Sequence, residues 1–322
     1  MLRHWDKVRT IRVALLGLGT VGGGFVRLVE REHARIRDRI GLEIEIAAIL
    51  VRDREKDRGD VDRSLITTTA VDVIDAGCDV VVELVGGVHC AGAYVRRAIN
   101  NGSHVVTANK ALLAATGREL FDAASANGVQ IGFEASVCGG VPVVRALRRG
   151  LAGDSLESIT GILNGTSNYV LSRMEDGLPF ADAVKLAQEH GFAEAHPTLD
   201  LSGEDAAQKL EILTSLGFDS EVVSRSVHGI EWIDVDDVAR ARRRGNVFRQ
   251  VAEARRVAGG VALTVAAREL PLAHPLASVR DENNGVVFRG NAVGEVMLTG
   301  RGAGSLPTAA AVLSDVIEIG SA

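Results

Sequence analysis

The stretch Val-Ala-Leu-Leu-Gly-Leu-Gly-Thr-Val-Gly-Gly-Gly, residues 13–24, decides the fold of this chain. A short apolar strand runs into a Gly-x-Gly-x-x-Gly turn, and a helical stretch follows over 25–39. Gly17 permits the tight turn, Gly19 lets the backbone approach phosphates, and Gly22 lets the helix pack closely on the strand. The helix N-terminus then presents free N–H groups to an anion. The stretch predicts a site for a dinucleotide pyrophosphate. A glycine-rich turn without a ligand is the alternative, because the chain holds 36 glycines.

The composition excludes several classes of protein. At 322 residues the chain is long for one hydrophobic core, so we expect two domains. The net charge of −6 and the scattered basic residues argue against nucleic acid as a partner. The N-terminus carries no apolar secretory segment, and the apolar stretches are too short to span a bilayer, so we expect no membrane partner. Three cysteines without metal-ligand spacing fit a reducing compartment, and we predict a cytoplasmic protein.

Strand-like and helix-like segments alternate over the first third of the chain. We predict short apolar strands at 11–16, 44–50, 80–84, 104–107 and 129–134, and helices at 25–39, 91–100 and 111–127. This alternation is typical of parallel βαβ units, so the predicted fold class is α/β, a Rossmann-type doubly wound parallel sheet. Right-handed crossovers place the ligand crevice at the carboxyl ends of the strands.

The pattern changes after about residue 135. Helices at 142–151, 168–175, 180–190 and 203–216, with strands at 158–163, 261–266 and 286–289, predict a second domain of the α+β class. We therefore expect a dinucleotide-binding domain over 1–135 and a substrate-binding and dimerisation domain over 136–302. A last helix, within 303–322, is expected to pack back on the first domain.

The end of the second strand bears on the choice of dinucleotide. An acidic residue there binds the ribose 2′-hydroxyl of NAD, whereas an arginine accommodates the 2′-phosphate of NADP. Arg52 comes first, and a guanidinium suits a phosphate, so the sequence favours NADP, with NAD also possible. Asp53 argues the other way, and an ordinary solvated loop of mixed charge is the alternative.

Three further segments carry candidate chemistry. Gly86 and Gly87 follow a strand and would let a flat nicotinamide ring lie against the backbone, although a plain loop turn also explains them. Lys110 follows the next strand and can orient a carboxylate or donate a proton; a surface lysine that opens a helix is the alternative. Small residues over 134–142 expose backbone carbonyls that suit a hard cation, but a hinge between domains is the simpler interpretation.

The densest polar set is Glu194, Asp200, Asp205 and Lys209. Asp205 and Lys209 are four residues apart on one helix face, where an ordinary surface ion pair contributes about 0.2–0.5 kcal/mol. The functional interpretation is an amino-acid pocket, in which carboxylates hold a substrate ammonium and Lys209 acts as acid or base. Nearby carboxylates raise a lysine pKa and burial lowers it, so the sequence leaves the direction open.

Six segments in this order resemble the homoserine dehydrogenase family. They are 17–22, Thr-Ala-Asn-Lys at 107–110, 134–142, Leu-Asn-Gly-Thr-Ser-Asn at 163–168, 191–209, and Gly-Ala-Gly at 302–304 with Pro-Thr-Ala at 307–309. The resemblance covers nearly the whole chain. It implies the NAD(P)-dependent interconversion of L-homoserine and L-aspartate 4-semialdehyde in threonine and methionine biosynthesis. It also implies a homodimer built through the second domain.

The resemblance further implies a role for each matching residue. The pyrophosphate would be held by Gly17, Gly19, Thr20, Val21 and Gly22. The remaining cofactor contacts would be Arg52 at the 2′-phosphate, Gly86 and Gly302 near the nicotinamide or its ribose, and Lys110 between cofactor and substrate. Homoserine would be bound or framed by Glu194, Asp200 and Asp205, with Lys209 as proton donor. A monovalent cation, usually sodium, would be bound by the backbone carbonyls of Glu134, Val137, Gly139 and Val141.

The expected reaction moves a hydride between the nicotinamide and the C4 carbonyl carbon of the semialdehyde, and a lysine ammonium supplies the proton. Lys209 is preferred over Lys110 because it lies in the acidic set, but both lysines remain candidates. A dehydrogenase of the same layout acting on another small aldehyde is one alternative, and a non-catalytic dinucleotide sensor is another. The acids and lysines argue against both alternatives.

The chain also departs from the family pattern. His196 stands where the family often has an aspartate, and His89-Cys90 replaces a segment that usually contains proline. The sequence continues for 18 residues past Gly304, and from this we expect a short form of the family without the C-terminal regulatory ACT domain of many relatives. We therefore expect activity that is insensitive to threonine at low concentration.

Overall fold

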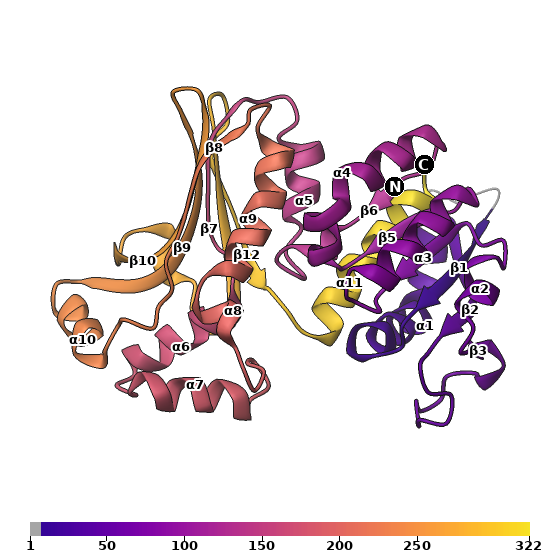
Figure 1. The fold of residues 1–322 in the computed structure, drawn as a ribbon, viewed down its shortest axis with the longest axis horizontal. Helices are drawn as coiled ribbons and strands as arrows, with labels where there is room; N and C mark the ends of the chain where they lie inside the picture. Colours follow the sequence, from indigo (N-terminus) through magenta and orange to yellow (C-terminus); the bar gives the residue numbers. More distant parts are fainter. Residues whose placement is uncertain (1–7) are drawn as a thin grey trace. The chain divides into compact units, whose positions relative to one another are not determined.

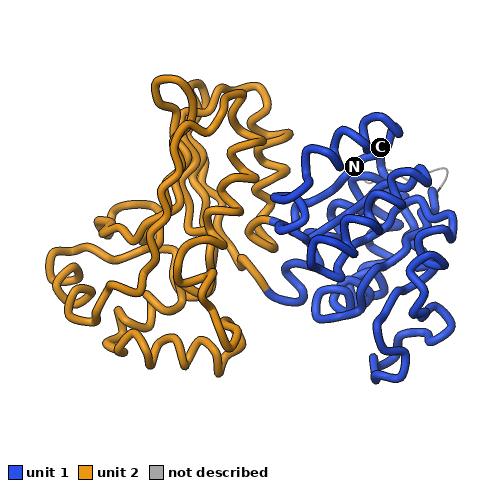
Figure 2. The backbone as a smooth tube through the Cα atoms, in the orientation of Figure 1, with its two compact units in different colours: residues 1–136, 304–322 blue, residues 137–303 orange. Residues whose placement is uncertain are grey.

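The computed structural model describes residues 8–322 and divides into two compact units. Unit 1 comprises the described residues up to Ser136 together with Gly304–Ala322, and unit 2 comprises Val137–Ala303 (Figure 2). The C-terminal segment thus belongs to the same unit as the N-terminal glycine turn.

Unit 1 is built on a six-stranded sheet in the order β3-β2-β1-β4-β5-β6, and all of its strand pairs are parallel. Its strands are β1 (Arg9–Leu16), β2 (Leu42–Leu50), β3 (Ile66–Thr67), β4 (Val80–Glu83), β5 (His104–Thr107) and β6 (Ile131–Gly132). The strand order reverses between β1 and its neighbours β2 and β4, which makes the carboxyl end of β1 the expected ligand crevice. The predicted Rossmann-type sheet is confirmed (Figure 1).

The helices of unit 1 are α1 (Thr20–Ile40), α2 (Ala70–Ile74), α3 (His89–Asn100), α4 (Lys110–Ala126) and α11 (Ser305–Gly320), with 3₁₀ turns η1 (Arg63–Leu65) and η2 (Glu134–Ser136). The prediction that the first helix begins at residue 25 is wrong, because α1 begins inside the glycine run. A Cβ on Gly24 would lie 2.8 Å from the Ser305 Oγ and 3.2 Å from the Ala309 Cβ. Glycine is therefore required within α1 because α11 packs directly against it.

The strand predicted at 129–134 is also shorter than expected. It covers only Ile131–Gly132 and passes into the turn η2. A Cβ on Gly132 would lie 2.7 Å from the Asp315 Cβ, and the Asp315 Oδ2 accepts a hydrogen bond from the Glu134 N–H at 2.8 Å. Contact with α11 therefore replaces sheet pairing at this edge.

Unit 2 contains a second six-stranded sheet in the order β12-β11-β7-β9-β10-β8. Its strands are β7 (Leu156–Ile162), β8 (Val222–Val227), β9 (Asn246–Val257), β10 (Gly260–Pro271), β11 (Asn283–Gly290) and β12 (Gly294–Arg301). The β10–β8 pair is parallel and the other pairs are antiparallel, so the sheet is mixed. The predicted second domain of the α+β class is confirmed, but the sequence indicated only three of these strands.

The helices of unit 2 are α5 (Val143–Arg145), α6 (Gly165–Glu175), α7 (Phe180–Glu189), α8 (Thr198–Leu201), α9 (Glu204–Gly217) and α10 (Val235–Arg243), with the π turn η3 (Ala146–Gly150) and the 3₁₀ turn η4 (Pro275–Ser278). Helix α9 packs on β7, β9 and β10 (Figure 1). The apolar side chains between α6 and its neighbours form a separate core, which includes Leu171, Met174 and Ile230. Packing against the sheet fixes α9, which carries Asp205 and Lys209, and Asp200 lies on the preceding short helix α8.

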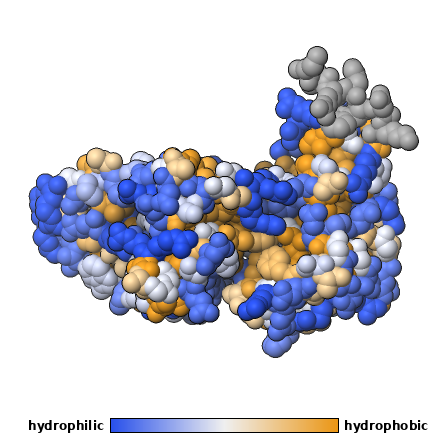
Figure 3. Space-filling model, turned by 90° about the horizontal axis from the view of Figure 1, so that it is seen from above, coloured by the Kyte–Doolittle hydropathy of each residue, from blue (hydrophilic) through white to orange (hydrophobic). Residues whose placement is uncertain are grey.

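In the face shown by Figure 3, hydrophilic residues cover much of the surface and apolar residues lie in patches between them. Across residues 8–322, no helix combines the length and the apolar character needed to cross a bilayer.

Candidate active site

The glycine turn between β1 and α1 is held by close contacts within the protein. Gly17 has φ +104°, donates its N–H to the Leu50 carbonyl at 3.0 Å, and would place a Cβ 2.7 Å from the Leu84 carbonyl oxygen. A Cβ on Gly22 would lie 2.1 Å from the Gly17 carbonyl oxygen. At Gly19, by contrast, an added Cβ would meet nothing within 4 Å. Gly17 and Gly22 are therefore required by the fold, whereas Gly19 leaves open space beside the backbone.

The N-terminus of α1 is suited to a phosphate. Its N-cap is Gly19, no side chain caps the first turn, and that turn contains no acidic residue. The first N–H groups of a helix have no partner within the helix and attract anions. Open space at Gly19 and uncapped N–H groups at Thr20, Val21 and Gly22 therefore fit a pyrophosphate.

The loop after β2 binds back to the glycine turn. Arg58 donates to the Leu18 carbonyl at 3.2 Å and to the Asp53 carbonyl at 2.9 Å. The Asp53 side chain accepts a hydrogen bond from the Glu55 N–H at 2.9 Å, in a local turn. Arg52 is exposed at the end of β2. Arg52, which is predicted to meet a 2′-phosphate, is thus accessible. The Asp53 carboxylate, which would favour NAD, already accepts a backbone hydrogen bond from Glu55.

The ends of β4 and β5 form one hydrogen-bonded edge. The fully buried Glu83 carboxylate accepts hydrogen bonds from the Val85 and Gly86 N–H groups at 2.9 and 3.0 Å, and from the Thr107 hydroxyl at 2.6 Å. Gly86 has φ +70°, which the turn requires. The role of Glu83 in shaping the Gly86 turn was not predicted from the sequence; the available signal was an acidic residue at the end of an apolar strand.

Lys110 begins α4 directly after this edge. Asn109 is the N-cap: its Oδ1 accepts from the Leu112 N–H at 3.1 Å, and its Nδ2 donates to the Gly87 carbonyl at 2.6 Å. Lys110 is half-buried. The structure therefore fixes the position of the Lys110 backbone beside the Gly86–Gly87 turn.

Lys209 lies in the polar set of unit 2. Its Nζ is 2.7 Å from the Asp205 Oδ2 and donates to the Leu163 carbonyl at 2.8 Å. Only 15% of the Lys209 side chain and 11% of the Asp205 side chain are exposed. The predicted i, i+4 pair is therefore a largely buried one, and the ammonium has a fixed direction.

The structure also settles the direction of the Lys209 pKa. Burial lowers it, but the Asp205 carboxylate, with smaller contributions from Cys138 and Asp200, outweighs burial and raises the pKa above its usual 10.5. We expect Lys209 to be an ammonium at neutral pH. An ammonium is the form that can donate a proton.

Asn164 links the two aspartates, and sequence analysis gave it no role. Its Nδ2 donates to the Asp200 Oδ1 at 2.6 Å and to the Asp205 Oδ2 at 2.8 Å. Its Oδ1 caps α6 by accepting from the Ser167 N–H at 2.8 Å. The amide therefore offsets repulsion between two carboxylates and joins α6 to α8 and α9. The available signal was an asparagine at a helix N-cap inside the family-specific segment.

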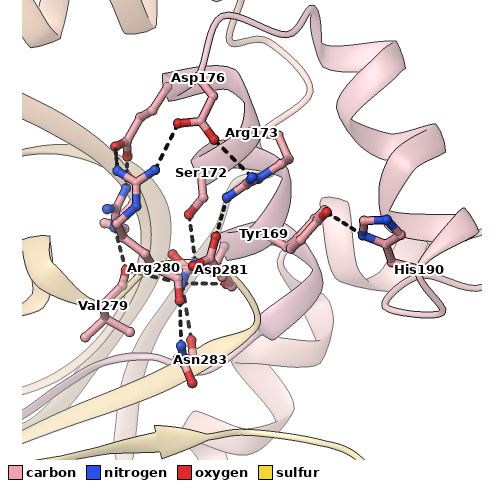
Figure 4. A network of polar contacts seen from close by, with 12 residues as sticks. Tyr169, Ser172, Arg173, Asp176, His190, Val279, Arg280, Asp281 and Asn283 are labelled. Carbon is pink, nitrogen blue, oxygen red and sulfur yellow. Dashed lines mark hydrogen bonds and ion pairs between the residues drawn. The ribbon is translucent and has the colours of Figure 1, made fainter.

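Glu194 stands apart from these contacts. It is exposed in the loop after α7, where the Gln188 side chain donates to the carbonyls of Glu194 and Ala195 at 3.1 and 3.2 Å. The Tyr169 hydroxyl and the His190 Nδ1 are 2.8 Å apart, which joins α6 to the start of this loop (Figure 4). The structure brings Asp200, Asp205 and Lys209 together, whereas the contact that holds Glu194 is the hydrogen bond from Gln188 to its backbone carbonyl.

The segment predicted to bind a cation is tightly folded. Cys138 and Gly139 have φ +57° and +49°, and the Val141 N–H donates to the Cys138 carbonyl at 2.9 Å. The Val141 carbonyl itself accepts from the Val143 N–H at 2.8 Å. Within residues 8–322, no group of three His, Cys, Asp or Glu side chains is placed to hold a metal ion. Backbone carbonyls remain the candidate ligands here.

Gly302 is buried at the end of β12. A Cβ on Gly139 would lie 2.4 Å from the Gly302 carbonyl oxygen, and the Gly140 N–H donates to the Arg301 carbonyl at 3.1 Å. A Cβ on Gly302 itself would collide with the Asn284 side chain. The turn at Gly302 is thus enclosed by protein within unit 2.

Comparison with known families accounts for both units. The homoserine dehydrogenase profile matches residues 142–317, and the profile of the homoserine dehydrogenase NAD-binding domain matches residues 17–134. The homoserine dehydrogenase of Bacillus subtilis is 42% identical over 317 residues, which are 97% of this chain and 73% of that protein. The chain belongs to the homoserine dehydrogenase family.

Solved homoserine dehydrogenases share the fold. The enzyme from Thiobacillus denitrificans superposes with a TM-score of 0.91 at 41% identity, over 98% of this chain and 74% of that one. A hyperthermophilic archaeal homoserine dehydrogenase in complex with NADPH superposes with a TM-score of 0.81 at 26% identity, over 97% of this chain and 98% of that one. The family resemblance inferred from the six segments is confirmed, and unit 1 is a domain for a nicotinamide cofactor.

Proposed function

We propose that this chain interconverts L-homoserine and L-aspartate 4-semialdehyde with NAD(P), a step of threonine and methionine biosynthesis, and that Lys209 is the proton donor. The observation that carries the proposal is the Lys209 ammonium, buried and aimed by Asp205 and the Leu163 carbonyl, in a member of the homoserine dehydrogenase family.

The chemistry divides between cofactor and protein. When bound, the nicotinamide supplies or accepts the hydride at its C4. As the aldehyde carbon is reduced, negative charge develops on its oxygen, and the Lys209 Nζ gives that oxygen a proton. In the oxidative direction the neutral Lys209 takes the hydroxyl proton. The raised Lys209 pKa therefore favours reduction near neutral pH.

The acids complete the substrate site. Asp200 and Asp205 both accept hydrogen bonds from the Asn164 Nδ2, and together they attract the ammonium group of homoserine. Glu194 lies on the exposed loop after α7 and binds the substrate from there. Lys110 is proposed between cofactor and substrate, where its charge orients the substrate carboxylate. It is the alternative proton donor.

NADP is the proposed dinucleotide, with NAD also accepted. The uncapped N-terminus of α1 binds the pyrophosphate at Gly17, Gly19, Thr20, Val21 and Gly22. The exposed Arg52 meets the 2′-phosphate, and the Asp53 carboxylate is already engaged with the Glu55 N–H. Gly86, in its left-handed turn, and Gly302 lie beside the nicotinamide or its ribose.

A monovalent cation, sodium in the first instance, is proposed at the backbone carbonyls of Glu134, Val137, Gly139 and Val141. The left-handed residues Cys138 and Gly139 interrupt regular backbone structure in this segment, and backbone carbonyls are suitable ligands for a hard cation. Replacing sodium by tetramethylammonium and following the unfolding temperature tests this assignment. A constant unfolding temperature argues for a hinge.

The proposed assembly is a homodimer through unit 2. One face of its sheet bears half-buried residues such as Thr160 and Thr264 with the Arg268–Glu253 ion pair, 2.8 Å apart. A sheet face of this kind can pair with a second copy.

Three free cysteines support a reducing compartment, and we propose the cytoplasm. Residues 1–135 with 303–322 would bind the dinucleotide, and 136–302 the substrate and the partner copy.

The decisive experiment is absorbance at the NAD(P)H band with homoserine and each dinucleotide. We expect reduction of the dinucleotide that depends on L-homoserine, faster with NADP at limiting cofactor concentration. A panel of other small hydroxy amino acids and aldehydes is the control. Equal or better turnover of a compound without the 2-amino group would contradict the assignment of the acids.

A further inference from the structure

Asn284 fills the space between two parts of unit 2. It lies near the start of β11 and is 1% exposed. Its Nδ2 donates to the Ile162 carbonyl at 2.8 Å, and its Oδ1 is buried with no hydrogen-bond partner among the described residues. A Cβ on Gly302 would lie 1.1 Å from that Oδ1. The amide therefore takes the place that a side chain on Gly302 would occupy.

The strand register explains which parts Asn284 joins. Strand β11 lies between β7 and β12, where Gly285 pairs with Ile162 and Asn284 pairs with Gly300. Ile162 directly precedes Leu163, whose carbonyl accepts the Lys209 hydrogen bond at 2.8 Å. Asn284 thus binds the strand end that directs Lys209 and, on its other side, packs against the turn at Gly302.

Helix α6 fixes the loop that leads to Asn284. The buried Asn168 donates through its Nδ2 to the carbonyls of Val279, Asp281 and Asn283, at 3.3, 2.9 and 3.2 Å. Ser172 accepts the Asp281 N–H at 2.9 Å and holds Asp281 at φ +58°. Figure 4 shows this loop against α6, with Arg173 paired to the Asp281 carboxylate.

The polar amide of Asn284 indicates a role beyond packing. An unpartnered buried carbonyl lowers stability relative to an apolar side chain of the same size. The amide is therefore maintained at some loss of stability, while its N–H group binds one particular carbonyl. A stability argument alone would favour valine or leucine at this place in a buried strand.

We propose that Asn284 is a positioning residue of the reaction. It holds the strand that directs the Lys209 proton donor and the turn at Gly302 at one fixed separation. The inference rests on the proposed function, in which Lys209 gives the proton and Gly302 lies beside the nicotinamide. Proton and hydride must arrive at neighbouring atoms of one carbonyl group, and small misplacements slow such steps strongly.

The test uses two variants of equal shape in the full chain. Asn284→Thr suits a strand and keeps an O–H donor for the Ile162 carbonyl, whereas Asn284→Val has the same shape without a donor. The control is Ser103→Ala, which removes a buried hydroxyl that donates to the Cys78 carbonyl at 2.8 Å, at the start of β5 and away from its carboxyl end. For each variant we would measure kcat, KM for homoserine, Kd for NADPH, and the unfolding temperature. The isotope effect with NADPH deuterated at nicotinamide C4 completes the set.

We expect Asn284→Val to lower kcat at least tenfold and to raise the isotope effect, with KM and the NADPH Kd within about threefold of wild type. Asn284→Thr should regain at least fivefold in kcat over Asn284→Val. Ser103→Ala should lose unfolding temperature but keep the wild-type kcat and isotope effect.

The proposal is overturned if both Asn284 variants lose unfolding temperature like Ser103→Ala and keep the wild-type kcat and isotope effect. It is also overturned if the valine and threonine variants have equal kcat. A wild-type protein without homoserine-dependent reduction of NAD(P) would instead overturn the proposed function, and that measurement needs no variant.

Discussion

The glycine turn of unit 1 and the lysine cluster of unit 2 are built in opposite ways. At the turn, protein backbone meets protein backbone, and the absence of side chains at Gly17 and Gly22 is what matters. In the cluster, Asn164, Asp205 and Lys209 are fixed by hydrogen bonds between side chains and by one carbonyl. The first arrangement leaves no room for a side chain at Gly17 or Gly22, and the second depends on every one of its polar side chains.

The difference assigns separate tasks to the two regions. A pyrophosphate is bound by N–H groups that every residue carries, so its site depends on backbone shape. Proton transfer needs one titratable group in one direction, so its site depends on side-chain chemistry. Substitutions should therefore separate cofactor binding from turnover.

The largest expected effect is the loss of the proton donor. Lys209→Ala should lower kcat by about 10²–10⁴-fold, the usual contribution of a positioned acid or base. Its NADPH affinity should remain near wild type, because the glycine turn is untouched. Single-turnover absorbance and fluorescence titration with NADPH measure the two quantities.

Lys110→Ala is the matched control for that experiment. It removes a lysine of the same charge at the start of α4 and should affect KM more than kcat. The opposite pattern, in which Lys110→Ala is inactive and Lys209→Ala turns over normally at several pH values, would assign the proton donor to Lys110.

The pH dependence of the reaction rate tests the assignment of Lys209 as proton donor. Because the Lys209 pKa is raised above 10.5, the ammonium persists through neutral and mildly alkaline pH. Reduction of the semialdehyde should therefore be nearly constant from about pH 7 to pH 10. Oxidation of homoserine needs the neutral amine, so its kcat/KM should rise about tenfold per pH unit over that range. A plateau in oxidation that begins near pH 7 would contradict a raised pKa.

The Lys209–Asp205 ion pair also makes the stability of the fold depend on pH. A lysine whose pKa is higher in the folded state stabilises the fold most fully below its unfolded pKa. That contribution declines as pH rises through the folded value. Alkaline unfolding of the wild type and of Lys209→Met, which is uncharged and of similar length, should differ in this direction.

The next largest effect is expected from alanine substitutions in the glycine turn, where Gly22→Ala and Gly19→Ala form a matched pair. Gly22→Ala should destabilise the fold by about 3 kcal/mol, because its Cβ would meet the Gly17 carbonyl. Gly19→Ala should leave the unfolding temperature unchanged, because nothing lies within 4 Å of the added Cβ. Gly19→Ala should nevertheless weaken the binding of NADPH, because the phosphates of NADPH approach this backbone. If Gly19→Ala binds NADPH as well as wild type does, the pyrophosphate does not lie against Gly19.

Much of unit 1 could be predicted because its determinants are local. The order of apolar strand, glycine turn and helix occurs within about 30 residues, and each parallel strand is a continuous apolar run. The start of α1 could not be predicted in the same way. It depends on α11, which is almost 300 residues further along the chain and fills the space left by Gly24.

Unit 2 resisted prediction because buried polar residues interrupt its patterns. Strand β9 was missed since it places Arg249 and Gln250 in the interior, and no alternation of apolar and polar residues survives there. The fully buried Arg249 is compensated by Glu175, which lies 74 positions earlier in the chain. Asn164 and Asn284 were unassigned for the same reason, because their partners are distant in sequence.

The smallest expected effect lies at the edge of the cofactor site. Arg52→Ala should weaken NADP about tenfold, near 1.5 kcal/mol, because a charge-assisted hydrogen bond at an exposed position has roughly this value. NAD carries no 2′-phosphate, so its affinity should stay the same. Arg54→Ala is the control, since Arg54 is also exposed and lies two residues further along the loop.

Equal losses of affinity for NADP and NAD in Arg52→Ala would remove Arg52 from the phosphate site. A loss confined to NADP in Arg54→Ala would move that role along the loop and leave the backbone binding of the pyrophosphate unaffected. In either case the loop after β2 would be a region where side chains, and not backbone shape, decide the choice between the two dinucleotides.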